Sequence, residues 1–411
     1  MNDRQNGRSN VRAVEGGVTA PSGFRAAGLH CGIKASGKPD LSLIVSDKPA
    51  AAAGLFTINL AKAAPLYLCE EHLAKSGAQA RAIVTNSGCA NACTGPRGES
   101  DAREMAQLTA AAVGCNKEHV LVASTGVIGV NLKMDAIRSG IPMAVKALDA
   151  NGGAAAARAI MTTDPFPKEY AVEVDTKPFG SFRVGGMAKG SGMIEPRMAT
   201  MLGYLTTDAA VDGVMLQRAL AEASRYTFNA ITVDGEPSTN DCVFALANGA
   251  SGVTISDHLY PALVEAFRAV AHELALGIVR GGEGATKLIS ITVTGAATDA
   301  DAWVAARAIA NSPLVKTAVH GGDPNWGRLV AAAGRSGAKF VLAGARVQIG
   351  SLVLFENGGP FDELAPKAAE YLTGKDLEIT VDVGAGGSHR ATVWTCDLSA
   401  EYVKINAEYR T

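Results

Sequence analysis

Short apolar runs alternate with longer amphipathic segments over most of the chain. The runs at residues 82–85, 120–123 and 230–233 have the length and composition of buried strands. A turn is predicted at residues 124–126, directly after the second run. Residues 1–20 are polar and rich in glycine, which predicts an irregular lead-in.

Amphipathic spacing predicts three helices between these strands. Residues 101–113 lie between Ser100, a residue type common at helix N-caps, and Gly114, a typical helix stop. Helical spacing also covers residues 212–226 and 260–276. Helices and strands are mixed along the chain, which predicts a layered α/β or α+β architecture.

The pattern changes after about residue 285. Ile289, Ile291 and Val293 alternate with polar residues, as in a strand with one buried face. The other elements predicted in this part are helices near 301–310 and at 362–373, a β-rich stretch at 338–358, and a hairpin of strands 377–383 and 390–396.

Composition and charge exclude several classes of function. The 411 residues carry 38 Lys and Arg against 40 Asp and Glu, and only 5% are aromatic, so nucleic acid and membrane surfaces are not expected partners. No apolar run reaches the length of a membrane span, and the polar N-terminus does not resemble a signal peptide. Seven scattered cysteines favour reduced thiols and a cytoplasmic protein.

The common catalytic and metal motifs are also missing from the sequence. Cys89 and Cys93 have no matching second pair, and His272-Glu273 lacks a second histidine four residues on, so no metal site is expected. The segment 282–287 lacks the ending of a phosphate-binding loop, and residues 190–192 do not form the Gly-x-Ser-x-Gly motif of hydrolases.

The segment 189–209 is the most unusual part of the chain. It contains a Gly-Ser-Gly loop, a proline and then Ala199-Thr200. A threonine between small and apolar neighbours is commonly a buried strand residue. Thr200 would instead be a nucleophile if the bond after Ala199 were cut, because the new α-amine could act as its base. Spacing alone leaves both interpretations open.

Further motifs, spread over the chain, help to interpret this segment. Besides residues 189–209, they are residues 18–28, 85–92, 124–129, 161–164, 231–235, 238–241, 323–328 and 406–411. Together they resemble the ornithine acetyltransferase family, also called bifunctional glutamate N-acetyltransferases. The resemblance covers about residues 18–411.

The resemblance implies an enzyme that cuts itself before Thr200, giving an α chain of residues 1–199 and a β chain of residues 200–411. Thr200 would take the acetyl group from N-acetylornithine and pass it to glutamate in a ping-pong scheme. This arginine-biosynthesis reaction needs no cofactor. Whether acetyl-CoA is a second acetyl donor stays open, because no residue decides it.

Family resemblance also assigns the site. Thr125 and Gly126 match the pair that forms the oxyanion hole, and the substrate-binding positions match Thr162, Lys189, Thr200, Glu283, Asn406 and Thr411. Without the resemblance, an ordinary turn, a helix cap, exposed loops and a frayed tail would explain these residues.

The fold implied by the resemblance is a four-layer αββα sandwich, similar to the N-terminal-nucleophile hydrolases. It would occupy residues 1–285, and a smaller α+β domain would occupy residues 286–411, with its tail returning to the active site. Two cleaved copies would assemble as an α2β2 heterotetramer.

Some residues depart from the family pattern, and two other functions stay open. The departures include Glu195, Arg197, Ala230, Gly281 and the segment 320–322, and Arg197 lies close to the cleavage point. One alternative is an amidase or aminopeptidase on the same scaffold, in which water replaces glutamate. The other is an uncleaved, non-catalytic paralogue.

Overall fold

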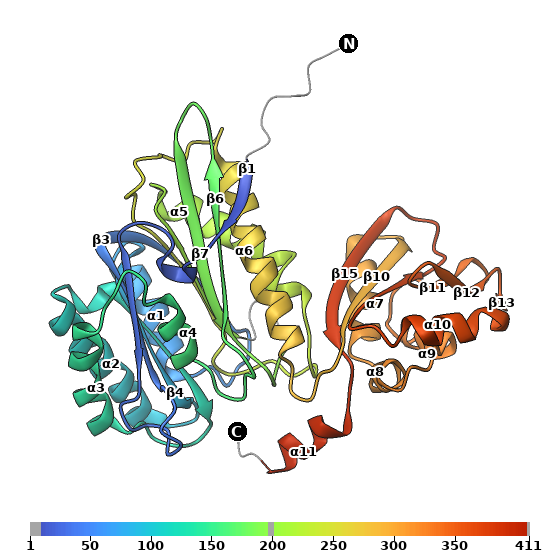
Figure 1. The fold of residues 1–411 in the computed structure, drawn as a ribbon, viewed down its shortest axis with the longest axis horizontal. Helices are drawn as coiled ribbons and strands as arrows, with labels where there is room; N and C mark the ends of the chain where they lie inside the picture. The colour runs from blue at the N-terminus through green and yellow to red at the C-terminus, as the bar shows by residue number, and fades with distance from the viewer. Residues whose placement is uncertain (1–9, 196–200, 409–411) are drawn as a thin grey trace.

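Residues 10–195 and 201–408, which the computed structural model describes, form a nine-stranded and a six-stranded β-sheet with helices packed on both (Figure 1). No helix in these ranges is long and apolar enough to cross a bilayer.

The long strand β3 (Leu41–Phe56) divides the nine-stranded sheet into two leaves. Its first half pairs with β2 and β4, its second half pairs with β9, and the register slips between Val45 and Ala50. The first leaf contains β2 (Phe24–Leu29), the first half of β3, β4 (Gln79–Cys89) and β5 (Val120–Val127). The second leaf contains β1 (Asn10–Val14), β6 (Lys168–Asp175), β7 (Ser181–Lys189), β8 (Leu202–Thr207), β9 (Cys242–Ala247) and the second half of β3.

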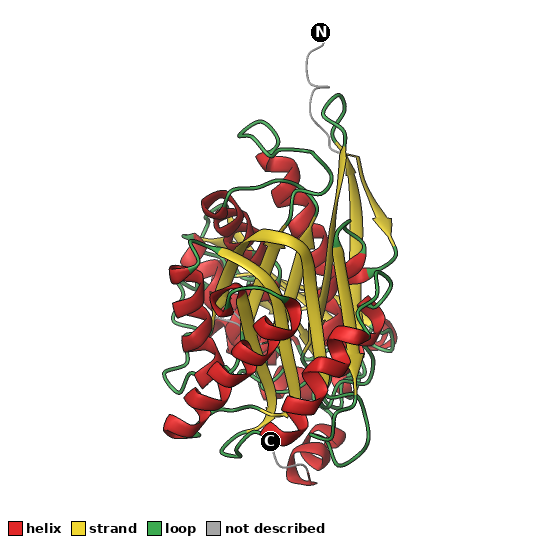
Figure 2. Cartoon of the chain, turned by 90° about the vertical axis from the view of Figure 1, so that its left-hand side faces the viewer, coloured by secondary structure: helices red, strands yellow, loops and turns green. Residues whose placement is uncertain are grey.

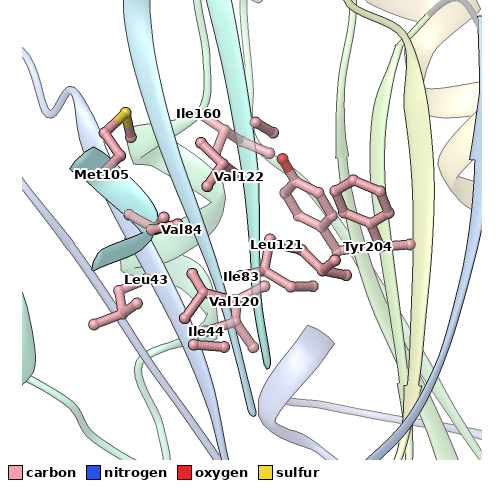
Figure 3. Packing of buried hydrophobic residues seen from close by; sticks show 14 of the residues in the cluster. Leu43, Ile44, Ile83, Val84, Met105, Val120, Leu121, Val122, Ile160 and Tyr204 are labelled. Atoms are coloured by element: carbon pink, nitrogen blue, oxygen red, sulfur yellow. The ribbon is translucent and has the colours of Figure 1, made fainter. Parts of the chain in front are cut away.

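The two leaves pack face to face. Tyr204 on β8 is fully buried, and its hydroxyl lies 2.8 Å from the Thr85 hydroxyl on β4. Ile83 shares this face of β4, because side chains alternate along a strand, whereas Val84 points toward Met105 (Figure 3). A buried hydrogen bond and apolar packing therefore join the leaves.

Helices cover the outer faces of both leaves. The first leaf is covered by α1 (Ala64–Lys75), α2 (Gly95–Val113) and α3 (Met134–Lys146), and α4 (Gly153–Ala159) packs against β2 (Figure 2). The second leaf is covered by α5 (Gly213–Arg225) and α6 (Tyr260–Arg280). The order helix, leaf, leaf, helix confirms the four-layer αββα sandwich.

Local sequence explains where these helices begin and end. The Asp212 carboxylate accepts hydrogen bonds from the N–H groups of Val214 and Met215, which caps α5. Gly114 ends α2 in the left-handed conformation, at φ 76°, as predicted. Three short 3-10 helices connect the elements: η1 (Gly17–Thr19), η2 (Lys117–His119) and η3 (Phe228–Ala230).

The six-stranded sheet contains the end of the chain. Its strand order is β13 (Gly359–Pro360), β12 (Leu352–Glu356), β11 (Arg346–Ile349), β14 (Asp376–Asp382), β10 (Leu288–Ala296) and β15 (His389–Cys396). Its helical elements are α7 (Asp299–Ala310), α8 (Pro313–His320), α9 (Trp326–Gly334), η4 (Leu342–Gly344), η5 (Asp362–Leu364) and α10 (Ala365–Tyr371). The last helix, α11 (Ala400–Glu408), leaves this sheet and returns to the core (Figure 1).

The predicted hairpin at the end of the chain is wrong. β14 and β15 do not pair with each other, because β10 lies between them, parallel to β14 and antiparallel to β15. Residues 384–388 are therefore a crossing over the end of β10. Nothing in the two strand patterns reports which partner each strand takes.

Four smaller predictions also need correction. Helix α2 begins at Gly95, so Ser100 lies inside the helix. Residues 124–126 continue β5 and do not form a turn. Residues 230–233 contain the end of η3 and one isolated bridge, between Ile231 and Trp394. The lead-in contains β1 and η1, which join the core.

Candidate functional site

A cavity of about 460 Å³ opens where β5 and β7 end. The rest of its wall comes from residues 162–163, residues 192–193, the loop at 234–240, the turn around Glu283 and α11, together with Asn59, Ala90 and Ile128. The chain thus brings segments from both leaves and from its last helix to one place. Figure 1 shows α11 at the foot of the core, away from the other helices of the C-terminal part.

Lys189 and Thr125 meet at the centre of this wall. Lys189 ends β7, Thr125 lies on β5, and both side chains are buried. The Lys189 ammonium donates to the Thr125 hydroxyl, with 3.3 Å between Nζ and Oγ1.

Gly126, the next residue, fits only because it has no side chain. Its φ is 130°, a region that favours glycine, and a Cβ here would lie 2.4 Å from the Gly88 carbonyl carbon. The backbone of β5 therefore approaches β4 very closely beside the cavity.

Asp164 organises the backbone around these groups. Its carboxylate accepts hydrogen bonds from the Lys168 ammonium at 2.6 Å, the Gly190 N–H at 2.8 Å and the Thr162 N–H at 3.0 Å. Burial alone would raise the pKa of Asp164, but the charges of Lys189 and Lys168 and these bonds lower it to about 2. The carboxylate stays ionised and fixes two segments of the cavity wall.

Positive charge is in excess on this side of the cavity. Lys34 donates to the carbonyls of Pro39 at 2.8 Å and Met161 at 2.7 Å, and burial lowers its pKa to about 8. Lys189 lines the cavity, and Lys34 and Lys168 lie behind it beside the carboxylates of Asp40 and Asp164, so three lysines face two carboxylates. Such a wall favours an anionic group on a bound molecule.

Acidic residues gather around Tyr402 of α11. The Asn406 amide donates to the Glu283 carboxylate at 2.8 Å, and the Tyr402 hydroxyl donates to Asp234 at 3.2 Å. Burial, followed by the charges of Asp234, Glu283 and Glu236, raises the pKa of Tyr402. This part of the wall favours a cationic group.

The segment 238–241 closes the site from β9. The Asn240 amide donates to the carbonyls of Ala90 at 2.5 Å and Ser124 at 2.9 Å, so it joins the loop that follows β4 to strand β5. Asp241 is buried, and its Oδ2 has no hydrogen-bond partner among the described residues. Burial raises the pKa of Asp241 well above its usual value, because it disfavours the charged form of the carboxyl.

The structure brings most of the predicted site residues to this cavity. The ones that line it are Thr125, Gly126, Thr162, Lys189, Glu283 and Asn406. Ala199, Thr200 and Thr411 lie outside the described residues. Met201, the residue after Thr200, is buried, and its carbonyl accepts a hydrogen bond from the Cys242 N–H at 3.0 Å.

Four residues of the site were not singled out from the sequence: Asp164, Asp234, Asn240 and Tyr402. The first three lie in motifs that the sequence analysis used, where a polar residue follows an apolar or threonine-rich run. A polar residue directly after such a run was the signal in the sequence that could have identified these three residues. Their partners are mainly backbone groups far along the chain, which a sequence pattern does not reveal.

A family model and curated relatives match almost the whole chain. The sequence model of the ArgJ family matches residues 25–411. The arginine biosynthesis bifunctional protein ArgJ of Synechocystis sp. is 49% identical, with 97% of this chain and 99% of that protein covered. The protein of the same name from Symbiobacterium thermophilum is 52% identical, with 97% and 99% covered. A solved structure of ornithine acetyltransferase complexed with ornithine, from Mycobacterium tuberculosis, is 43% identical with a TM-score of 0.43, covering 46% of this chain and all of that one.

Proposed function

Because the chain belongs to the ArgJ family, it is an acyltransferase of arginine biosynthesis, and we propose that it transfers the acetyl group of N-acetylornithine to glutamate. Thr200 is the proposed nucleophile and carries the acetyl group between the two substrates. The scheme needs no cofactor, because the acetyl group is held on the enzyme's own oxygen.

The charge pattern of the cavity carries this proposal. N-acetylornithine has an α-carboxylate and a side-chain ammonium, whereas glutamate has two carboxylates and an α-amine but no side-chain ammonium. Lys189 and the lysines around Asp164 suit a carboxylate, and Glu283 with Asp234 suits the ammonium. One cavity therefore has a place for both charged ends of the acetyl donor.

Self-cleavage would prepare the nucleophile. The Thr200 hydroxyl oxygen attacks the Ala199 carbonyl carbon, the peptide C–N bond breaks as the ester C–O bond forms, and the hydroxyl proton ends on the freed α-amine. Water then hydrolyses the ester, which releases the Ala199 carboxyl group and restores the hydroxyl. The new α-amine, with a pKa of about 8, can act as the base for Thr200.

Acetyl transfer would follow in two steps. The Thr200 oxygen attacks the acetyl carbonyl carbon of N-acetylornithine, the amide C–N bond breaks, and ornithine leaves with the hydroxyl proton on its amine. The α-amine of glutamate then attacks the acetyl ester, which forms N-acetylglutamate and returns a proton to Thr200. Thr125 and Gly126 are the proposed oxyanion hole for both tetrahedral intermediates.

Pairing between β-strands would hold the two products of cleavage together. Lys189 pairs with Leu202, and β7 and β8 continue as an antiparallel ladder as far as Val184 and Thr207. β3 and β9 form a second ladder between the two products. One sheet would therefore hold both pieces, as the proposed α2β2 assembly requires.

The proposed function is tested by measuring the release of ornithine from N-acetylornithine, with and without glutamate. The proposal predicts that ornithine and N-acetylglutamate form in equal amounts, with parallel lines in double-reciprocal plots at several glutamate concentrations. Ornithine and free acetate without glutamate would show a hydrolase instead. No ornithine under either condition would favour the non-catalytic paralogue.

A further inference from the structure

Glu195 is the last described residue before the proposed cleavage point, and its carboxylate is buried in an ion pair. The Arg307 guanidinium donates to Glu195 Oε1 at 2.8 Å, and the Asn311 amide donates to Oε2 at 3.0 Å. The side chains of Glu195 and Arg307 are only 4% and 16% exposed. Arg307 also donates to the Asn229 carbonyl of the core.

Hydrogen bonds also hold the backbone directly before Glu195. The Asp234 carboxylate accepts hydrogen bonds from the N–H groups of Met193 at 2.7 Å and Ile194 at 2.8 Å. The Ile194 carbonyl accepts a hydrogen bond from the Val233 N–H at 2.8 Å. All of these partners belong to the proposed β chain, whereas the residues they hold belong to the proposed α chain.

Arg307 and Asn311 come from a different part of the molecule. Arg307 lies in the last turn of α7, which packs on β10 and β15 of the six-stranded sheet, and Asn311 caps the end of that helix. The Thr232 hydroxyl of the core lies 2.7 Å from Asn311 Oδ1. The ion pair can therefore form only when the C-terminal part has folded and docked against the core.

We propose that the Glu195–Arg307 ion pair positions the segment that carries the scissile bond, so that self-cleavage waits for the C-terminal part to dock. This inference rests on the proposed self-cleavage before Thr200. Before docking, the Glu195 carboxylate would lack both of its partners, Arg307 and Asn311, so its side chain could not hold the backbone that leads to the scissile bond. Once Arg307 arrives, the backbone on the N-terminal side of the segment is fixed through its side chain as well as through Asp234.

The chain offers a matched control for this pair. Arg280 of α6 and Asp376 of β14 form an ion pair at 3.2 Å that also joins the core to the six-stranded sheet. It is exposed and involves neither Glu195 nor its neighbours. Arg280→Met therefore removes a contact between the same two parts without touching the cleavage segment.

Time courses of self-cleavage in a cell-free translation of the full chain test the proposal. Samples are quenched in detergent, and the conversion of the 42.1 kDa chain into two fragments is followed on gels. Arg307→Met and Glu195→Gln should slow cleavage about 100-fold, because a small misplacement of reacting groups has an effect of this size. Arg307→Lys keeps the charge but loses the planar fork, so it should retain cleavage within about 10-fold. Arg280→Met should cleave within about 2-fold of wild type, as expected for an exposed pair.

A second measurement separates positioning from general destabilisation. The melting temperature of each variant is compared in a Thr200→Ala background, where the chain should stay whole. Slow cleavage by Arg307→Met and Glu195→Gln, partial recovery by Arg307→Lys and normal cleavage by Arg280→Met would support the proposal. Wild-type rates in both Arg307→Met and Glu195→Gln would overturn it, and so would equal slowing by Arg280→Met at a matched melting temperature. A wild-type chain that never cleaves would instead refute the proposed function itself.

Discussion

Lys189 on β7 donates a hydrogen bond to the Thr125 hydroxyl on β5, with 3.3 Å between the two atoms. The contact crosses from the second leaf of the sandwich to the first, at the cavity between their ends. It places the cation proposed to bind substrate beside the residue proposed to stabilise the oxyanion. Substrate binding and transition-state stabilisation thus share one buried contact in this account.

Replacing Lys189 by methionine should weaken the reaction of both substrates, because each has an α-carboxylate. We expect kcat/KM to fall about 100-fold for N-acetylornithine and for glutamate, the size of effect seen when one partner of a buried charge pair is lost. Steady-state kinetics check this, with the exposed Lys75→Met as control. An effect confined to one substrate would contradict the role given to Lys189.

Glu283→Gln should instead change the KM for one substrate and not for the other. Only N-acetylornithine carries the side-chain ammonium that the Glu283 carboxylate would bind, and the variant keeps an oxygen that can accept the Asn406 hydrogen bond. KM for N-acetylornithine should rise about 10-fold or more, and KM for glutamate should change by less than about 2-fold. Equal changes in both values would show that Glu283 does not recognise the ammonium.

Gly126→Ala should disable the proposed oxyanion hole. Its Cβ would lie 2.4 Å from the Gly88 carbonyl carbon, so β5 must shift away from β4 beside the cavity. We expect kcat to fall at least about 100-fold, the usual effect of losing one oxyanion donor. Gly129 also has a positive φ, but a Cβ there has open space, so Gly129→Ala is the matched control and should keep kcat within about 3-fold.

Asp241 should make stability depend on pH. Burial raises its pKa above the usual 3.8, so the unfolded chain loses this proton at a lower pH than the folded protein does. The stability contributed by the protonated carboxyl is therefore complete below about pH 3.8 and is lost as pH rises toward the folded pKa, at about 1.4 kcal/mol per pH unit.

Asp241→Asn should remove that loss, because an amide has a similar shape and no charge to bury. Thermal unfolding of the Thr200→Ala protein at pH 5 and pH 8, with and without Asp241→Asn, measures the difference. The variant should gain stability relative to its parent at the higher pH. A constant difference between the two proteins across this range would mean that Asp241 is ionised in the folded state.

Local patterns predicted the elements whose signals are contained in their own residues. Gly114 was predicted to stop a helix, and it ends α2. The helical spacing at residues 212–226 predicted α5. The alternation of Ile289, Ile291 and Val293 predicted β10, where all three side chains are buried. The family motifs, taken together, predicted the four-layer sandwich.

The features that sequence did not predict depend on partners far along the chain. The predicted pairing of β14 with β15 was wrong, because β10, some 80 residues earlier in the chain, lies between them. Asp164 and Asp234 act through backbone N–H groups at Gly190 and Met193, and no residue pattern reports such bonds. Glu195 was noticed only as a departure from the family, and its partner Arg307 was not noticed at all.

The mass of the intact protein under denaturing conditions tests the central claim most directly. The account predicts two fragments of roughly 20 and 22 kDa by residue share of the 42.1 kDa total, divided between Ala199 and Thr200. The Thr200→Ala variant should give one species of nearly full mass. A single 42.1 kDa species from the wild-type protein would mean that Thr200 has no free α-amine, and it would contradict the proposed nucleophile.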